Sequence, residues 1–281
     1  MTQNTHVDLL SNRLNLVGMV CALFMLNPCA HAEEASLTFG IFPYLSQQQL
    51  VGYFNPLRDY LQQVSGRKIA MITAPDYRSF RERTRTGAYD IILTAPHFAR
   101  LAEKESGFKR VAITRYHVQG VILVAQDSPV RQLSDLRGKS LAVTPATSLI
   151  HMLAMELFRH HGLQPGRDFK VNDQENFQNT MASTLRGDSD ACATGIAAWN
   201  SYDRKNSLRV IAKTAEASGL MIMAHPRVPG AVLASLRKAL FSFGETAERK
   251  AYFAATNHGA WLPVDDASMH ALDPYMSHAG D

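Results

Sequence analysis

The chain has 281 residues, of which 46% are hydrophobic and 19% are charged, and its formal net charge at pH 7 is +4. This length fits one large domain or two domains of ordinary size. Because the small positive charge is not gathered in a long run of Lys or Arg, the composition gives no support for nucleic-acid binding and is compatible with an anionic ligand.

The first 32 residues have the order of a secretory signal peptide. An apolar stretch from Leu14 to Leu26 follows Arg13, and Ala30-His31-Ala32 supplies a small-x-small cleavage site. A membrane anchor is the alternative, but the stretch is shorter than the roughly 20 residues that cross a bilayer. We therefore predict cleavage after Ala32 and a secreted, periplasmic protein.

Cleavage at that position would leave Cys192 as the single cysteine, because Cys21 and Cys29 lie in the leader. A lipoprotein anchor at Cys29 is less favoured because the bulky Pro28 precedes it. One cysteine cannot form an intramolecular disulfide, so stability must come from the core. We predict a buried, inert thiol, with a reactive or metal-binding thiol as the alternative.

Strands and helices alternate along the rest of the chain, as judged from hydrophobic periodicity and from Gly and Pro punctuation. A first series predicts strands at 37–42, 68–73, 89–94, 109–114 and 118–125, and helices at 50–64, 77–85 and 96–104. A second series predicts strands at 140–144, 169–172, 190–194 and 208–212, and helices at 147–161, 177–186 and 196–202. A strand at 220–224 is then followed only by helices, from 230 to the end.

This alternation predicts an α/β protein with largely parallel sheets. The two successive series predict two lobes, with chain crossings near 115–118 and 214–217. The first lobe would comprise 33–116 and 217–281, and the second 117–216. Ligands of open α/β sheets bind beyond the carboxyl ends of the strands, where helix N-termini point, so the cleft between the lobes is the expected site.

Three strand-to-helix junctions carry polar residues that would face this cleft. At the most informative one, Pro145 ends a strand, and Thr147 or Ser148 can cap the helix that follows. Free backbone N–H groups, the positive end of the helix dipole and two hydroxyls would together form a cradle for an anion. The alternative is that these hydroxyls only cap their own helix.

The other two junctions lie in the first lobe. Thr94 and His97 fall at the end of a buried strand and the start of a helix, where His97 could donate to an oxyanion or simply cap or pack. Tyr44 lies just after the first strand, where its hydroxyl could donate a hydrogen bond to a ligand or its ring could form a partly buried side of the site. Tyr116 and His117 fall near the expected hinge.

Ordinary enzyme motifs are missing from the sequence. It has no Gly-x-Ser-x-Gly, Walker, His-Glu-x-x-His or Cys-x-x-Cys pattern. His160-His161 is the nearest approach to a metal motif, but adjacent helical side chains point about 100° apart and cannot easily share one metal. We therefore predict no enzymatic activity, no metal site and no cofactor.

The chain from Leu37 to about Pro229 resembles the periplasmic phosphonate/phosphite/phosphate-binding proteins of ABC importers. The matching segments are Pro43-Tyr44, Thr73 to Tyr77, Gly87 to Pro96, Leu133 to Lys139, Asp168 to Val171 and Gly187 to Ala191. The resemblance implies the type II periplasmic-binding fold and delivery of the ligand to a membrane permease.

The resemblance also implies site residues. In the typical member of the family, a Ser-Thr-Ser run at a helix start of the second lobe holds the phosphonate oxygens, and the matching positions read Thr147-Ser148-Leu149. A family histidine near the cleft falls close to Gln178 and Asn179, and a polar strand end falls near Thr194. Because no carboxylate is evident for an ammonium group, a small oxyanion or a differently decorated acid fits better than an aminoalkyl phosphonate.

Together these observations predict a monomeric solute-binding protein that closes on a small anion and delivers it to an ABC permease, with no nucleic-acid partner. The alternative is a ligand sensor of the same fold that partners a membrane histidine kinase. The sequence does not separate transport from sensing.

Overall fold

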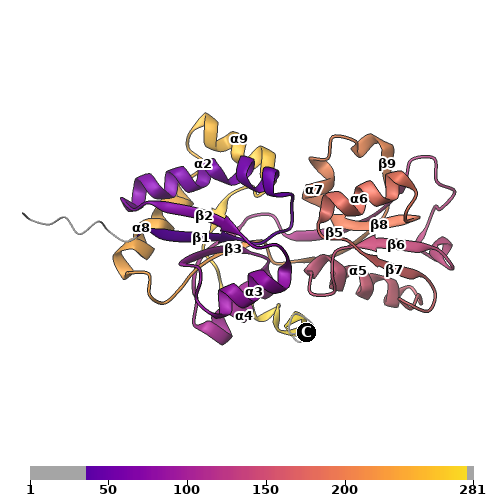
Figure 1. Ribbon diagram of the computed structural model, residues 1–281, viewed down its shortest axis with the longest axis horizontal. Helices are drawn as coiled ribbons and strands as arrows, with labels where there is room; N and C mark the ends of the chain where they lie inside the picture. The colour runs from indigo at the N-terminus through magenta and orange to yellow at the C-terminus, as the bar shows by residue number, and fades with distance from the viewer. Residues whose placement is uncertain (1–35, 277–281) are drawn as a thin grey trace, which may run out of the picture. The chain divides into compact units, whose positions relative to one another are not determined.

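Two mixed β-sheets organise residues 36–276, the part of the chain that the computed structural model describes (Figure 1). The first sheet contains β1 (Leu37–Ile41), β2 (Ile69–Thr73), β3 (Ile91–Thr94), β4 (Lys109–Thr114), β10 (Met221–Ala224) and β11 (Trp261–Leu262). The second contains β5 (Val118–Ala125), β6 (Ser140–Val143), β7 (Lys170–Asp173), β8 (Ala191–Gly195) and β9 (Leu208–Ala217). Their strand orders are β11-β4-β10-β3-β1-β2 and β7-β6-β8-β5-β9. The predicted signal peptide lies outside the described residues.

Helices cover both faces of each sheet. Those of the first lobe are α2 (Gln47–Ser65), α3 (Tyr77–Arg85), α4 (Pro96–Ser106), α8 (Gly230–Phe241), α9 (Ala247–Thr256) and α10 (Asp266–His270). Those of the second are α5 (Leu149–His160), α6 (Phe177–Arg186) and α7 (Ile196–Asn200). Short 3₁₀ turns are η1 (Leu133–Leu136), η2 (Lys205–Ser207) and η3 (Asp273–Tyr275). In Figure 1, α2 and α9 lie over one face of the first sheet and α3 and α4 over the other, and α6 and α5 flank the second sheet in the same way.

The predicted α/β class and two-lobed fold are confirmed, but the prediction of largely parallel sheets is wrong. Four of the nine strand pairings are parallel and five are antiparallel. The reason lies in the two crossings between the sheets. The first strand after each crossing, β5 or β10, enters its new sheet from the end opposite to that at which its neighbours begin. As a result β5 runs antiparallel to β8 and β9, and β10 runs antiparallel to β3 and β4.

Two further details differ from the sequence analysis. Trp261 forms the strand β11 with Leu262 and pairs with Thr114 of β4, so the prediction that only helices follow residue 230 is wrong. The strand β9 continues to Ala217, which pairs with Val118, so the second crossing lies at 218–220 rather than at 214–217. Gly219 is required there, because a Cβ atom would come within 2.3 Å of the Thr114 hydroxyl oxygen.

The same device fixes β3 beside β1 in the first sheet and β8 beside β6 in the second, with aspartates 100 positions apart in the sequence. The Asp90 carboxylate accepts hydrogen bonds from the backbone N–H of Thr38 at 2.7 Å and from its hydroxyl at 2.8 Å. The Asp190 carboxylate accepts the equivalent bonds from Ser140 at 2.9 and 2.8 Å. The two lobes therefore bring the carboxyl ends of corresponding strands to corresponding places.

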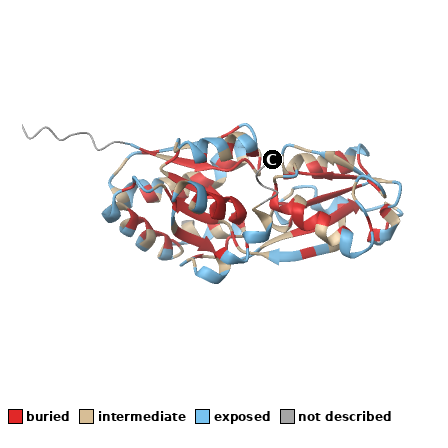
Figure 2. Cartoon of the chain, turned by 90° about the horizontal axis from the view of Figure 1, so that it is seen from below, coloured by how far each residue is buried: buried red, intermediate tan, exposed pale blue. Residues whose placement is uncertain are grey.

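The core lies between the sheets and their helices, where Figure 2 shows the buried residues gathering on the strands and on the inward faces of the helices. The four residues of β3 are all buried, as the continuous apolar run predicted. Cys192 is also fully buried, which raises the pKa of its thiol to about 12 and agrees with the prediction of a buried thiol. Within 36–276, no helix has the length and apolar character that a membrane span requires.

The close packing of β1 against a buried ring gives a stability prediction. In Gly40→Ala the new methyl group would lie 2.6 Å from the ring of Tyr89, which is fully buried, so we expect the free energy of unfolding to fall by about 1–3 kcal/mol. The matched control is Gly52→Ala in α2, where nothing lies within 4 Å and the change should stabilise the helix by about 0.5–1 kcal/mol. Urea unfolding followed by circular dichroism measures both, and shifts of the same sign would contradict the prediction.

Candidate functional site

The strand-to-helix junctions of the two sheets meet at two places. His97, in the first turn of α4, has its Nε2 atom 2.9 Å from the backbone oxygen of Thr147, just before α5. The backbone N–H of Phe177, at the start of α6, donates to the carbonyl of Tyr44 at 3.4 Å, and the rings of these two residues lie 6.2 Å apart. The junctions identified in the sequence analysis therefore come together from both lobes.

Three of the helices that begin at these strand-to-helix junctions lack side-chain caps among the described residues. No side chain caps α4, α5 or α7, which follow β3, β6 and β8, whereas Ser46, Asp76 and Asn176 cap α2, α3 and α6. Ser148 occupies the N-cap position of α5, but its hydroxyl accepts a hydrogen bond from Thr144 at 2.8 Å instead. The first N–H groups of a helix have no partner within the helix and carry its positive dipole end. Backbone donors are thus concentrated at these three starts.

Buried polar groups without partners lie at the same junctions. The hydroxyls of Thr94 and Thr194, the phenol of Tyr77 and the Nδ1 atom of His97 have no hydrogen-bond partner among the described residues. All four side chains are at most 3% exposed. Because leaving such a group unsatisfied costs about 1–3 kcal/mol, several together indicate a site that is completed by something other than the protein.

The protonation state of His97 follows from its surroundings. Burial lowers its pKa to about 4, against the opposing effect of the Thr147 carbonyl, so the ring is neutral at pH 7. A carbonyl oxygen only accepts, and therefore Nε2 carries the proton and Nδ1 is an acceptor. The one N–H group of the neutral ring is bonded to Thr147, so in this geometry His97 has an acceptor atom, Nδ1, and no second donor to offer.

Tyr77 is a candidate site residue that the sequence analysis did not single out. Its ring packs against Phe42 and Phe98, with centroids 6.3 and 6.2 Å apart. Burial raises the pKa of its phenol, and the nearby Ser148 hydroxyl opposes this rise although the two groups form no hydrogen bond of ordinary geometry. Tyr77 directly follows the helix-capping Asp76 and ends a segment that resembles the family, which was the available signal.

A small pocket of about 70 Å³ lies beside the first crossing between the sheets. Its lining includes Tyr44, Tyr116, His117, Gly195 at the start of α7, and His258. Tyr116 is 52% exposed, and His117 is paired with Glu216 at 3.2 Å on the surface. These two residues therefore lie at the first crossing between the sheets, in the same pocket as Gly195, the neighbour of Thr194.

The predicted residues thus fall in separate places. Thr94, His97, Ser148 and Thr194 are buried at the strand ends, and the His97 contact joins them to Thr147. Gln178 and Asn179 are half-buried on α6; the amide oxygen of Gln178 has no partner within the described part of the chain, and the backbone N–H of Asn179 is bonded to the cap residue Asn176. Over residues 36–276, no group of three His, Cys, Asp or Glu side chains could hold a metal ion.

Two buried histidines give a pH prediction. Burial lowers the pKa of His97 to about 4 and that of His258, whose Nδ1 lies 2.9 Å from the Tyr252 hydroxyl, to about 3. Between about pH 6.5 and these values the unfolded chain binds more protons than the folded chain. The free energy of unfolding should therefore decrease as the pH falls from 7.5 to 4.5.

Urea unfolding at the two pH values measures this decrease. His97→Gln keeps a donor for the Thr147 carbonyl and removes the titrating ring, so its decrease should be smaller than that of the wild type. His270→Gln, at an exposed position, is the control and should keep the full decrease. An unchanged pH dependence in His97→Gln would contradict the assigned protonation state.

Comparison with known proteins identifies the family and supports the fold. Residues 39–269 match the family model described as the phosphonate periplasmic substrate-binding protein of ABC transporters. A binding-protein component of an ABC phosphonate transporter from Pseudomonas aeruginosa is 18% identical, with 85% of each chain covered and a TM-score of 0.77. PhnD1 from Prochlorococcus marinus in complex with methylphosphonate is 14% identical, with 85% of this chain and 96% of that chain covered and a TM-score of 0.77.

A Xanthomonas citri protein bound to ATP is 20% identical, with 87% of this chain and 96% of that chain covered and a TM-score of 0.67. These likenesses confirm the fold, and the family match confirms the resemblance found in the sequence. The chain therefore belongs to the family of phosphonate periplasmic substrate-binding proteins of ABC transporters.

Proposed function

We propose that this protein binds a small phosphorus oxyanion between its lobes and delivers it to a membrane ABC permease. The family match supports the transport role. The observation that carries the ligand class is the presence, at these strand-to-helix junctions, of three helix starts without side-chain caps and of buried polar groups with no partner among the described residues. Backbone N–H groups and hydroxyls at such a place favour an anion over a neutral or cationic solute.

In this proposal the second lobe holds the anion through Thr147, Ser148 and the first N–H groups of α5. From the first lobe, the hydroxyls of Thr94 and Tyr77 donate to the remaining oxygens. In neutral His97 the Nε2–H group is bonded to Thr147, and the remaining ring nitrogen, Nδ1, can only accept a hydrogen bond. His97 therefore favours an oxyanion that keeps one P–OH group, such as a hydrogen phosphonate or hydrogen phosphate.

The remaining predicted residues have secondary parts in the proposal. Thr194, Gln178 and Asn179 extend the polar wall of the second lobe, and Tyr44 closes the site from the first. The segments that carry Tyr116 and His117 and that include Gly219 form the hinge. It lies between a first lobe of 33–116 and 218–281 and a second lobe of 117–217, one residue longer than predicted because β9 continues to Ala217. Closure of such lobes around a ligand couples occupancy to recognition by a partner.

We further propose that the chain acts as a monomer, without chemical turnover, after cleavage behind Ala32 and export to the periplasm. The family is one of substrate-binding proteins, which supports binding rather than catalysis. The proposed ligand residues also include no carboxylate and no charged base that would activate a nucleophile at neutral pH.

Removal of both cradle hydroxyls tests the proposal. Phosphate, phosphite or methylphosphonate at about 100 times its dissociation constant should add about 2.7 kcal/mol to the stability of the mature protein, which corresponds to a shift of a few degrees in Tm. In the double variant Thr147→Ala/Ser148→Ala the affinity for the bound anion should fall at least tenfold, because each hydrogen bond to a charged group contributes about 1.5–3 kcal/mol. Isothermal titration calorimetry measures this loss.

The matched control is Thr246→Ala, which removes a hydroxyl that caps α9. This variant should lose stability and keep its affinity for the anion. An unchanged affinity in the double variant would refute the assigned cradle, and the absence of binding to any phosphorus oxyanion would refute the ligand class.

Tyr77→Phe separates a role in binding from a role in folding. Removal of a buried hydroxyl without a protein partner should leave the stability of the free protein unchanged or raise it by about 1 kcal/mol, whereas the affinity for the anion should fall about tenfold. Tyr89→Phe is the matched control, because the Tyr89 hydroxyl is also buried without a described partner but belongs to the packing around Gly40. Equal affinities of both variants and the wild type would exclude Tyr77 from the site.

A further inference from the structure

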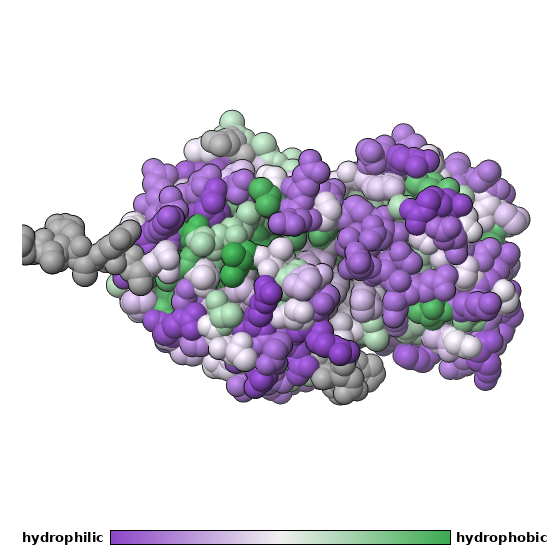
Figure 3. Space-filling model, in the orientation of Figure 1, coloured by the Kyte–Doolittle hydropathy of each residue, from purple (hydrophilic) through white to green (hydrophobic). Residues whose placement is uncertain are grey.

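A groove of about 710 Å³ runs between helix α5 and the C-terminal segment of the described chain. Met152 and Met155 line it from α5 together with the polar residues His151, Glu156 and Arg159, and Thr147 lines it from the turn before that helix. Ala271, Pro274 and Tyr275 line it from the other side. Its volume lies in the range of small-molecule sites. The face of the molecule in Figure 3 is mostly hydrophilic. The groove combines apolar and aromatic residues from both walls with the charged side chains of Glu156 and Arg159 on α5.

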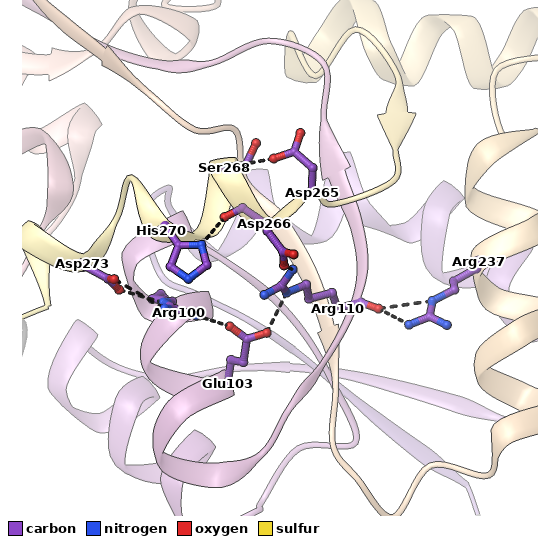
Figure 4. A network of polar contacts seen from close by, with 9 residues as sticks. All are labelled: Arg100, Glu103, Arg110, Arg237, Asp265, Asp266, Ser268, His270 and Asp273. Carbon is purple, nitrogen blue, oxygen red and sulfur yellow. Dashed lines mark hydrogen bonds and ion pairs between the residues drawn. The ribbon is translucent and has the colours of Figure 1, made fainter.

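Ion pairs hold the C-terminal wall of this groove in place (Figure 4). Arg100, which is 7% exposed, binds Asp273 through its Nε atom at 2.8 Å, and Lys104 binds the same carboxylate at 3.2 Å. The Tyr275 hydroxyl then reaches Glu156 on α5 at 3.4 Å. The segment is therefore attached to α4 of the first lobe and touches α5 of the second, which gives the groove two defined walls.

The groove is continuous with the proposed anion cradle, because Thr147 belongs to both. Met152 connects them as well, since it lines the groove and also packs in the buried cluster that contains Phe42 and Tyr77. The opposite wall, from Ala271 onward, lies beyond residue 269, where the family match ends. The family match therefore does not account for this wall.

The groove defines the class of ligand more closely. Methionine side chains adapt to apolar and aromatic groups, and a tyrosine ring offers a further flat contact. We propose that the physiological ligand is a phosphonate or phosphomonoester with a bulky apolar substituent, whose anionic head binds at the start of α5 and whose substituent lies in this groove. This inference rests on the proposed function, because the head group must occupy the cradle.

Three probes test it by isothermal titration calorimetry on the mature protein. Methylphosphonate tests the head alone, 4-phenylbutan-1-ol tests the substituent alone, and 3-phenylpropylphosphonate combines the two. Since each buried methylene contributes about 0.8 kcal/mol, the combined probe should bind at least tenfold more tightly than methylphosphonate. The alcohol should bind at least a hundredfold more weakly than the combined probe.

Ala271→Trp fills the groove from an exposed position on its C-terminal wall, and Ala271→Ser is the matched control. The tryptophan variant should bind 3-phenylpropylphosphonate no better than methylphosphonate and keep its methylphosphonate affinity within twofold of the wild type. The serine variant should behave as the wild type with both probes.

Equal affinities of the wild type for both phosphonates would overturn the inference and leave the proposed function intact. An equal loss of both affinities in Ala271→Trp would also overturn it, because the groove would then not be specific to the substituent. If neither phosphonate binds to the wild type, both the inference and the proposed anion site fail.

Discussion

The hydrogen bond from the His97 imidazole to the Thr147 carbonyl is the contact on which the candidate site depends. It joins the start of α4 to the start of α5, and it determines which ring nitrogen carries the proton. Burial keeps the ring neutral, so no cationic side chain enters the site at this point. Attraction for an anion then comes from helix dipoles, backbone N–H groups and hydroxyls, whose partial charges are fixed in direction. The basic side chain of Arg227 instead pairs with Asp90 at 2.7 Å, at the amino end of β3 and thus at the opposite end of this strand from Thr94.

The common plan of the two lobes explains why the polar groups meet. Asp90 and Asp190 align corresponding strands, so Thr94 and Thr194 end up buried at corresponding strand ends. The lobes differ in the residues that follow this plan. Tyr77 opens α3, whereas Phe177 opens α6 at the corresponding place, so only the first lobe adds a phenol to the site. The cleft is therefore chemically asymmetric although its scaffold is repeated.

Local patterns predicted much of this fold, and long-range packing accounts for what they did not predict. Helix 177–186 was predicted with its observed bounds, because its apolar spacing and its closing Gly187 are local signals. Strand direction was not predicted correctly, because it depends on where the chain crosses between the sheets. The strand β11 was missed because two residues are too few to show periodicity. The strand-end residues of the site followed from a general rule of open sheets. The pairing of His97 with Thr147 joins residues 50 positions apart, so no local pattern reveals that the donor of His97 is already in use.

The packing between the junctions sets the energetic role of a ligand. Phe42 stacks on Tyr44 within the first lobe, with centroids 4.4 Å apart, and Tyr44 meets Phe177 of the second lobe edge-on, so one aromatic contact favours the approach of the lobes without any ligand. Such aromatic pairs contribute about 0.5–1.5 kcal/mol each. The buried groups without partners oppose closure at about 1–3 kcal/mol each. Four such groups outweigh one aromatic pair between the lobes, so a ligand that satisfies the polar groups while leaving the aromatic contact intact can shift the equilibrium toward closure. An apolar solute would satisfy none of these groups, and selectivity for an oxyanion follows from that difference.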